Sequence, residues 1–144
     1  MTDRRSGRCL CDAIQFSADI TDTGLQACHC TQCQRWTGGG ALYVVRVANV
    51  SIEGEEAISH HRASGHGERG FCAHCGSTIY WRMQGGEIID LPVGLFDDQS
   101  GWTMAEEIFT DRRAPWMVPF AGAIQSTEAE QMAKLEEYLK KEKP

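Results

Sequence analysis

Seven cysteines in closely spaced groups constrain this chain of 144 residues more than any other feature. One residue separates the first two cysteines, two residues separate the last two, and the other three lie within a six-residue segment. The groups are Cys9 and Cys11, then Cys28, Cys30 and Cys33, and then Cys72 and Cys75. A close group supplies several thiolates from one local structure, so that few long loops must be closed around an ion. The spacing therefore indicates metal binding, with zinc as the expected ion.

The rest of the sequence favours a compartment in which thiols stay reduced. No apolar stretch approaches the roughly 18 residues that a membrane span requires. The polar N-terminus, with Arg4 and Arg5, lacks the apolar segment of a secretory signal. We therefore expect a cytoplasmic protein without a membrane partner. In the cytoplasm a cysteine-rich pattern indicates metal binding or catalysis rather than disulfides, and the odd number of cysteines agrees with this.

Charge and length restrict the class of protein. Twenty acidic against 14 basic residues give a net charge of -6, which disfavours nucleic acid as a partner because phosphate contacts need a basic face. The length and the 42% hydrophobic content predict one folded domain. We assign residues 1–125 to a zinc-binding domain and residues 126–144 to a C-terminal helical appendage of the same domain.

The residue pattern predicts a mainly β fold. Segments rich in β-branched and apolar residues alternate with turn residues, and Gly85 with Gly86 marks a hairpin turn. The glycine-rich segment 63–70 is expected to be a loop. The expected strands are residues 7–17, 41–50, 57–62, 77–83, 87–93 and 106–110.

A helix is expected over residues 127–142. Thr127 and Glu130 have the spacing of a capping box. An apolar repeat at helical spacing follows in Met132, Leu135 and Leu139. We expect this helix to pack as an appendage on the β domain.

The cysteine groups can form one closed and one open metal site. Cys72 and Cys75 precede Gly76, which can adopt the positive φ that turns backbone N–H groups toward two thiolates. On the expected strand 7–17, Cys9 and Cys11 project from the same face, so that one ion can contact both. The other three thiolates can hold an ion whose fourth position accepts water or substrate, as in catalytic zinc sites. Four and three thiolates account for every cysteine, which predicts two zinc ions per chain.

Other pairings and roles are open at this point. The spacing also allows Cys72 and Cys75 to complete a site with two of the three cysteines from Cys28 to Cys33. A single cysteine is often only a small buried apolar residue, but seven in close groups argue against that role for the set. A thioredoxin-like redox pair requires a helix after its motif, whereas residues 77–80 predict a strand.

The histidines beside the cysteines are expected not to bind the ion. Successive side chains of a short extended motif point in opposite directions. His29 and His74 therefore point away from the sulfurs, either into solvent or into the surroundings of the ligands.

Three motifs occur in a characteristic order along the chain. They are Gly7-Arg8-Cys9-Leu10-Cys11, then Cys28-His29-Cys30-Thr31-Gln32-Cys33 followed by Gly38-Gly39, and then Phe71-Cys72-Ala73-His74-Cys75-Gly76-Ser77. In this order they resemble the glutathione-dependent formaldehyde-activating enzyme family, which also includes centromere protein V. The resemblance runs from about Gly7 to Met117.

The resemblance implies an Mss4-like fold of short antiparallel sheets around zinc sites. It also implies which cysteines bind a structural zinc ion and which bind a catalytic one. It implies carbon–sulfur lyase activity on S-hydroxymethylglutathione, the adduct of formaldehyde and glutathione. One departure is Glu107, which stands before Ile108 where many members carry a histidine. Substrate contacts are therefore not carried over to that segment. The implied ligands are Cys9, Cys11, Cys72 and Cys75 for a structural zinc ion, and Cys28, Cys30 and Cys33 for a catalytic zinc ion.

We therefore expect a zinc-dependent enzyme that acts on a small thiol adduct, with glutathione as the candidate partner. An open zinc site would bind a substrate thiol and lower its pKa. The candidates for holding the carboxylates of such a substrate are Arg35, Arg46, Arg62 and the N–H groups of Gly38 to Gly40. Simpler roles are equally open: Arg35 as a surface residue stacked on Trp36, and the three glycines as a tight turn. The alternative is a non-catalytic, zinc-stabilised binding module.

Overall fold

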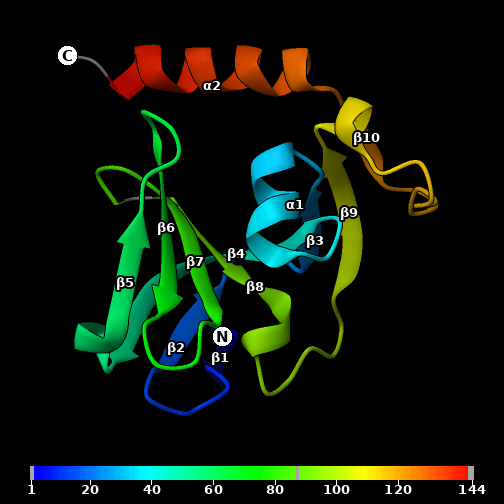
Figure 1. Cartoon of the computed structure of the whole chain (residues 1–144). Coiled ribbons are helices and arrows are strands. Elements are labelled where there is room, and N and C mark those ends of the chain that lie inside the picture. Colours follow the sequence, from blue (N-terminus) through cyan, green and yellow to red (C-terminus); the bar gives the residue numbers. More distant parts are fainter. Residues whose placement is uncertain (1, 87, 143–144) are drawn as a thin grey trace. The chain divides into compact units, whose positions relative to one another are not determined.

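Strands form most of the regular structure of this chain (Figure 1). The structure is a computed structural model, and it describes residues 2–86 and 88–142. Ten strands and the C-terminal helix α2 (Glu128–Glu142) lie within these residues, which confirms the mainly β prediction. The chain divides into two compact units, Met1–Leu25 with Tyr43–Thr103 and Gln26–Leu42 with Met104–Pro144.

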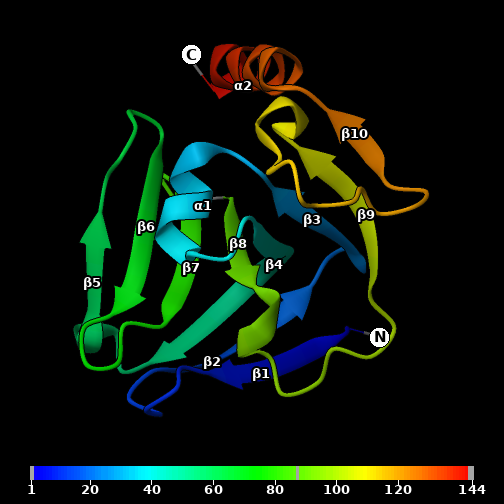
Figure 2. The same cartoon turned by 45° about the vertical axis from the view of Figure 1, so that its right-hand side comes forward.

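The first unit is built on an antiparallel sheet. Its strand order is β1-β2-β4-β8-β7-β6-β5, and each neighbouring pair is antiparallel. Figure 2 shows β5, β6 and β7 side by side at one end of this sheet. The strands are β1 (Arg4–Arg8), β2 (Gln15–Ile20), β4 (Leu42–Glu53), β5 (Ile58–His61), β6 (Gly67–Cys72), β7 (Thr78–Met83) and β8 (Ile89–Pro92).

Apolar side chains of this sheet pack into one core. Phe96 receives the rings of Phe16 and Trp102 edge to face, each at a centroid distance of 5.1 Å. Cys9 and Cys72 are buried in the same core, so two of the predicted metal ligands are held by well-packed structure. The largest fully buried aliphatic side chains of this core are those of Ile14, Val45, Ile79 and Leu91.

Two glycines of β6 explain why the expected loop 63–70 is wrong in its second half. A Cβ at Gly67 would lie 2.7 Å from the ring of Trp81, and a Cβ at Gly70 would lie 2.6 Å from the ring of Tyr80. Both rings belong to the paired strand β7. Glycine here makes room for an aromatic neighbour in a strand, a role that resembles a loop signal when the sequence is read alone.

The second unit combines the remaining strands with both helices. Strand β9 lies between β3 and β10, and β10 pairs with β9 in parallel. Helix α1 follows β3 after two residues, and a short 3-10 turn, Thr110–Arg112, follows β9. The elements are β3 (Gly24–Cys28), α1 (Thr31–Thr37), β9 (Thr103–Ile108), β10 (Ile124–Ser126) and α2.

The start of α2 has the predicted capping box. Thr127 N donates to Glu130 Oε1 at 3.0 Å, and Glu130 N donates to Thr127 Oγ1 at 3.3 Å. Glu128 attaches the helix to the turn after β9, because its N–H donates to Asp111 Oδ1 at 2.9 Å and its carboxylate accepts from Arg112 at 3.1 Å. The helix expected over residues 127–142 is therefore confirmed, and hydrogen bonds and an ion pair hold its N-terminal end.

The other predicted elements agree with the structure in part. The strands expected at 41–50, 57–62, 77–83 and 106–110 correspond to β4, β5, β7 and β9. The strand expected at 87–93 corresponds to β8 and pairs with β7, but Glu87 lies outside the described residues. The prediction did not include β3, β10 or α1.

The single strand expected over residues 7–17 is wrong. The chain leaves β1 after Arg8, turns, and returns as β2 from Gln15. Cys9 N donates to Ile14 O at 3.0 Å, and Asp12 adopts a φ of 66° within the turn. Asp is one of the few residues that tolerate this left-handed conformation. Cys9 and Cys11 are therefore presented by a turn and not by one face of a strand.

Candidate metal centres

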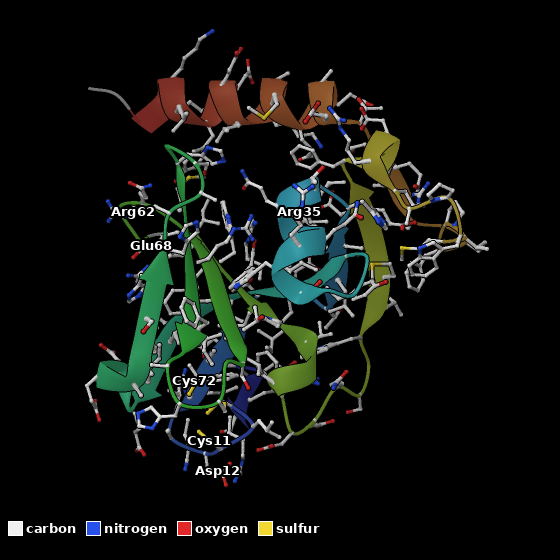
Figure 3. All side chains as sticks on the ribbon, viewed as in Figure 1. Cys11, Asp12, Arg35, Arg62, Glu68 and Cys72 are labelled. Atoms are coloured by element: carbon white, nitrogen blue, oxygen red, sulfur yellow. The ribbon has the colours of Figure 1, made fainter. Side chains whose placement is uncertain are left out.

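Four cysteines of the first unit converge on one point. Cys9 and Cys11 come from the β1–β2 turn, while Cys72 ends β6 and Cys75 lies in the turn before β7. The Sγ of Cys11 lies 3.7 Å from that of Cys9 and 3.8 Å from that of Cys72. All four Sγ atoms lie within 4.8 Å of one another. Figure 3 labels Cys11 and Cys72, which lie at the same end of this unit.

These distances fit a tetrahedral zinc site. A zinc–sulfur bond of about 2.3 Å gives a tetrahedron whose sulfur–sulfur edges are about 3.8 Å. Two of the observed sulfur–sulfur distances, 3.7 and 3.8 Å, match this edge. The donor set consists only of thiols, which is typical of structural zinc sites. Cys72 and Cys75 thus meet Cys9 and Cys11 and not the three cysteines of the second unit.

Backbone N–H groups face the sulfurs of this group. Cys72 Sγ accepts from the N–H groups of His74 and Cys75, both at 3.4 Å, and Cys9 Sγ accepts from Ile14 N at 3.4 Å. Gly76 has the positive φ that the sequence predicts, at 78°. Hydrogen bonds from Ser77 lower the pKa of Cys75 to about 5. A backbone hydrogen bond from Ala13 would lower the pKa of Cys11, but burial and the neighbouring sulfurs outweigh it and raise that pKa. A bound cation would stabilise the thiolate form of both residues, which is the form that binds metal.

Three cysteines of the second unit form a separate group. Cys28 ends β3, Cys30 caps α1, and Cys33 lies in the first turn of α1. Their Sγ atoms also lie within 4.8 Å of one another, and Cys28 and Cys33 are buried. Within residues 2–86 and 88–142, no fourth His, Cys, Asp or Glu side chain joins this group.

The close sulfurs of this group need a counter-charge in order to ionise. The neighbouring sulfurs of Cys30 and Cys33, together with burial, raise the pKa of the Cys28 thiol. A bound divalent cation reverses this effect, because it stabilises each thiolate directly. The donor set therefore fits zinc, with three protein ligands and room in the coordination sphere for a further one.

Helix α1 sets the geometry of the three-cysteine group. Cys30 has extended dihedral angles, φ -61° and ψ 155°, and its Sγ accepts from Cys33 N at 3.3 Å in the manner of an N-cap side chain. At the other end, Gly38 adopts a left-handed conformation, and its N–H donates to Gln34 O at 2.8 Å. The helix has only seven residues and little apolar periodicity, so it was not expected from the sequence. Gly38, as a C-terminal cap, is a sequence signal that could have indicated it.

His29 lies buried between two of these cysteines. Its side chain has no exposed surface, and its Nε2 lies 2.8 Å from Oε1 of Glu107. Solvent exposure, one of the two roles expected for His29, is therefore wrong, whereas His74 is exposed as expected. No local sequence pattern indicates the pair, because its members lie 78 positions apart.

Glu107 is held from several sides. Its Oε2 accepts from Phe120 N and from Gln125 Nε2, both at 2.8 Å, and lies 3.4 Å from Arg113 Nη2. Burial alone would raise the pKa of Glu107, but hydrogen bonds from Gln125 and His29 outweigh that effect and lower the pKa. The carboxylate therefore stays ionised at neutral pH and accepts hydrogen bonds on both oxygens.

The groups expected to hold substrate carboxylates are largely engaged elsewhere. Arg46 makes a two-point ion pair with Asp90 at 2.9 and 3.1 Å, and Arg62 lies 3.9 Å from Glu68. Figure 3 labels Arg62 and Glu68. Arg35 is exposed on α1 two residues after Cys33, about 200° around the helix and thus on another face.

The glycine loop after α1 uses two of its N–H groups internally. Gly38 N donates to Gln34 O, and Gly39 N donates to Thr37 Oγ1 at 3.0 Å. These two groups are therefore not available to a substrate, contrary to the expectation from the sequence. Gly40 instead makes room for the side chains after β9, since a Cβ there would lie 3.1 Å from Trp116 and from Met117.

None of the described helices combines the length and the apolar character that crossing a membrane would require.

Comparison with known proteins places these features in a family. The model of the family described as "Glutathione-dependent formaldehyde-activating enzyme" matches residues 4–112, a range that contains all seven cysteines. A protein of Schizosaccharomyces pombe named as an uncharacterized lyase is 32% identical over 81 residues, which are 56% of this chain and 59% of that protein. The match thus spans less than two thirds of the length of this relative.

A solved structure shares the fold. The crystal structure of a Rhodobacter sphaeroides protein superimposes with a TM-score of 0.56, at 15% identity, over 85% of this chain and 99% of that chain. At this identity the likeness concerns the fold alone. The match of the family model over most of the chain is what decides the assignment. The chain, with its two groups of convergent cysteines, belongs to the glutathione-dependent formaldehyde-activating enzyme family.

Proposed function

We propose that this protein is a zinc-dependent enzyme that makes or breaks a carbon–sulfur bond in a small thiol adduct such as S-hydroxymethylglutathione. The observation that carries the proposal is the group of three cysteines, Cys28, Cys30 and Cys33, which has one ligand fewer than the four-cysteine group. Zinc sites with three protein ligands are typical of catalysis, and sites with four are typical of structural roles. Membership of the family and the name of the yeast relative as a lyase support the same reaction class.

The four-cysteine group would stabilise the fold, and the three-cysteine group would take part in the reaction. Cys9, Cys11, Cys72 and Cys75 would hold a structural ion and join the turn after β1 to the turn after β6. The other three thiolates would hold a second ion at the start of α1. When bound there, zinc would supply Lewis acidity and would lower the pKa of a substrate thiol.

The reaction itself needs no redox partner. In the lyase direction the carbon–sulfur bond of the adduct breaks and its electron pair stays on sulfur. The hydroxyl group of the adduct becomes the carbonyl group of formaldehyde, and its proton is transferred to the sulfur. In the opposite direction the thiol adds to the carbonyl carbon. In either direction the protein would hold the sulfur atom of the thiol and the oxygen atom of the adduct or of formaldehyde in a fixed orientation around the reacting carbon.

A direct test combines metal analysis with a rate measurement. The reduced protein is expected to contain about two zinc ions per chain. It is also expected to accelerate the exchange between glutathione, ¹³C-formaldehyde and their adduct, which NMR exchange spectroscopy follows directly. Cys30→Ser should lose the acceleration and one zinc ion while remaining folded. A zinc-loaded protein that leaves the exchange rate at its uncatalysed value would remove glutathione from the proposal.

One observation favours the alternative of a non-catalytic binding module. Large apolar side chains are exposed in the segment after Met117, at Val118, Phe120 and Ile124. Such exposure is typical of interaction surfaces. Two bound zinc ions without turnover of any thiol adduct in a panel would favour this function over the enzyme.

A further inference from the structure

His29 connects the three-cysteine group to a buried carboxylate. In the sequence this residue stands between two of the candidate ligands, Cys28 and Cys30. Its ring is fully buried, and its Nε2 is 2.8 Å from Oε1 of Glu107, which is 1% exposed. The ring is therefore attached to the stretch of main chain that carries both sulfurs.

The environment of Glu107 determines how the ring is held. Three donors surround its Oε2, namely the N–H of Phe120, the amide of Gln125 and the guanidinium of Arg113. An ionised carboxylate only accepts hydrogen bonds, so Nε2 of His29 carries the hydrogen of the shared bond. Nδ1 of His29 is buried and has no hydrogen-bond partner within the part of the chain that the structure describes. The bond to Glu107 is thus what anchors the ring.

The main chain of His29 is fixed as well. Its N–H donates to the carbonyl of Ile108 at 3.0 Å, directly after Glu107 in the chain. Its carbonyl accepts from Gln34 Nε2 at 2.7 Å, which ties the residue to helix α1. Side chain and backbone together hold the segment between the two ligands against the end of β9 and against α1.

We propose that Glu107 is a positioning residue of the three-cysteine site, which acts through His29 to fix the Cys28–Cys30 main chain so that three sulfurs face one ion. This inference rests on the proposed function only in requiring that these cysteines hold a metal ion. Glu107 is not one of the candidate ligands, and it reaches them through His29. It has the role that a hydrogen-bond partner behind a ligand usually has in a metal site, which is to fix the geometry of the ligands.

The test measures metal binding and does not depend on turnover. The protein is loaded with one equivalent of zinc, which fills the tighter closed site, and is then titrated with Co²⁺ while the cobalt–thiolate and d–d absorption bands are recorded. Glu107→Gln removes the negative charge, and its amide NH₂ group faces other hydrogen-bond donors, either His29 or the groups around Oε2. We expect it to weaken binding of the second ion about 10- to 100-fold and to shift the d–d bands.

A matched control exists on the same strand. Glu106 precedes Glu107 in β9, points to the other side of the strand, and accepts from Gln26 Nε2 at 2.7 Å. Glu106→Gln makes the same change in charge one residue away. It should leave both the Co²⁺ affinity and the absorption bands as in the wild type.

Two variants of His29 distinguish a loss of ligand positioning from a general loss of protein stability. His29→Gln keeps an N–H donor at the place of Nε2 and should retain most of the Co²⁺ affinity, whereas His29→Leu should weaken binding as much as Glu107→Gln. The double variant H29L/E107Q should be no weaker than H29L alone, because both changes remove the same interaction. If Glu107→Gln does not fold, as judged by circular dichroism, the comparison of the two His29 variants decides.

The outcomes distinguish this inference from the proposed function. Unchanged Co²⁺ affinity and unchanged bands in Glu107→Gln, or equal losses in His29→Gln and His29→Leu, would overturn the inference alone. A wild-type protein that binds no second ion would overturn both. Weakened Co²⁺ binding in Glu107→Gln, in a protein that turns over no thiol adduct, would support the inference while counting against the proposed function.

Discussion

Cys11 and Cys72 lie 61 positions apart in the sequence, and their sulfur atoms lie 3.8 Å apart in the structure. One belongs to the turn after β1 and the other ends β6. A metal ion between them would close a long loop of the chain, which is the arrangement in which a cross-link stabilises a fold most. Metal binding at the four-cysteine group would therefore be coupled directly to folding.

Replacing a ligand in each group should have different effects on stability. Cys72→Ser is expected to unfold the protein, because a structural zinc ion contributes about 10–16 kcal/mol, which is as large as the whole net stability of a typical domain, about 5–15 kcal/mol. Cys30→Ser should keep a melting temperature near that of the wild type and lose one zinc ion. Thermal unfolding followed by circular dichroism, with zinc analysis of the same samples, checks this. Equal melting temperatures for the two variants would contradict the division into structural and catalytic sites.

A methyl group at Gly70 should be destabilising. A Cβ there would lie 2.6 Å from the Tyr80 ring, so Gly70→Ala forces the ring or the strand to move, at a cost of about 1–3 kcal/mol. Gly65→Ala is the matched control, since a Cβ at Gly65 meets nothing within 4 Å. Denaturant unfolding of the two variants gives both free energies. A Gly70→Ala protein as stable as the control would show that β6 and β7 are less tightly packed than the structure indicates.

The capping box should stabilise the first turn of α2. Thr127→Ala removes the Oγ1 that accepts from Glu130 N and should cost that turn about 1 kcal/mol, while Thr127→Ser keeps the oxygen and should cost much less. Hydrogen exchange of the amides of residues 128–131 measures the difference. Equal protection in the alanine and serine variants would mean that the contacts of Glu128 with Asp111 and Arg112 hold this end without the hydroxyl group of Thr127.

The lowered pKa of Glu68 should make the free energy of unfolding depend on pH. Burial would raise its pKa, but the hydrogen bond from Arg82 and the charges around it lower the pKa below the ordinary value of 4.5. A carboxyl group whose pKa is lowered on folding stabilises the folded state above its unfolded pKa, and this contribution is lost as the pH falls through the folded pKa.

Glu68→Gln should therefore be less stable than the wild type at neutral pH, by about 1–2 kcal/mol, because the hydrogen bond from Arg82 then goes to a neutral amide oxygen and not to a charged carboxylate. The difference should remain constant down to about pH 5.5 and shrink below the ordinary pKa of a glutamate. Melting temperatures across this range, with exposed Glu56→Gln as the control, give the curve. A difference that grows toward acid pH would contradict the lowered pKa.

The cysteine groups could be predicted from the sequence because their chemistry is local. Short spacings such as that of Cys72 and Cys75 bring two sulfurs together in almost any turn, and Gly76 indicates the conformation of that turn. The strands β4, β5 and β7 were predictable for a similar reason, since their β-branched and apolar residues lie between clear turn signals. The capping box of Thr127 and Glu130 is also a local signal.

What the sequence could not show depends on partners that are distant in the chain. The buried pair of His29 and Glu107 joins residues 78 positions apart, and neither residue type alone indicates burial. Helix α1 was not predicted, because it has no apolar repeat and because its N-terminal cap is a cysteine sulfur and not one of the usual capping side chains. Gly70 looked like part of a loop because its partner, the ring of Tyr80, is visible only once β6 and β7 are paired.

The separation between Cys11 and Cys72 also bears on how the protein is made in the cell. During synthesis Cys9 and Cys11 leave the ribosome long before Cys72 and Cys75, so the four-sulfur group is incomplete while most of the first sheet is being translated. In that interval the two early thiols are accessible to oxidants and to foreign metal ions. Newly made chains should therefore be far more vulnerable to oxidative stress and zinc shortage than the mature protein.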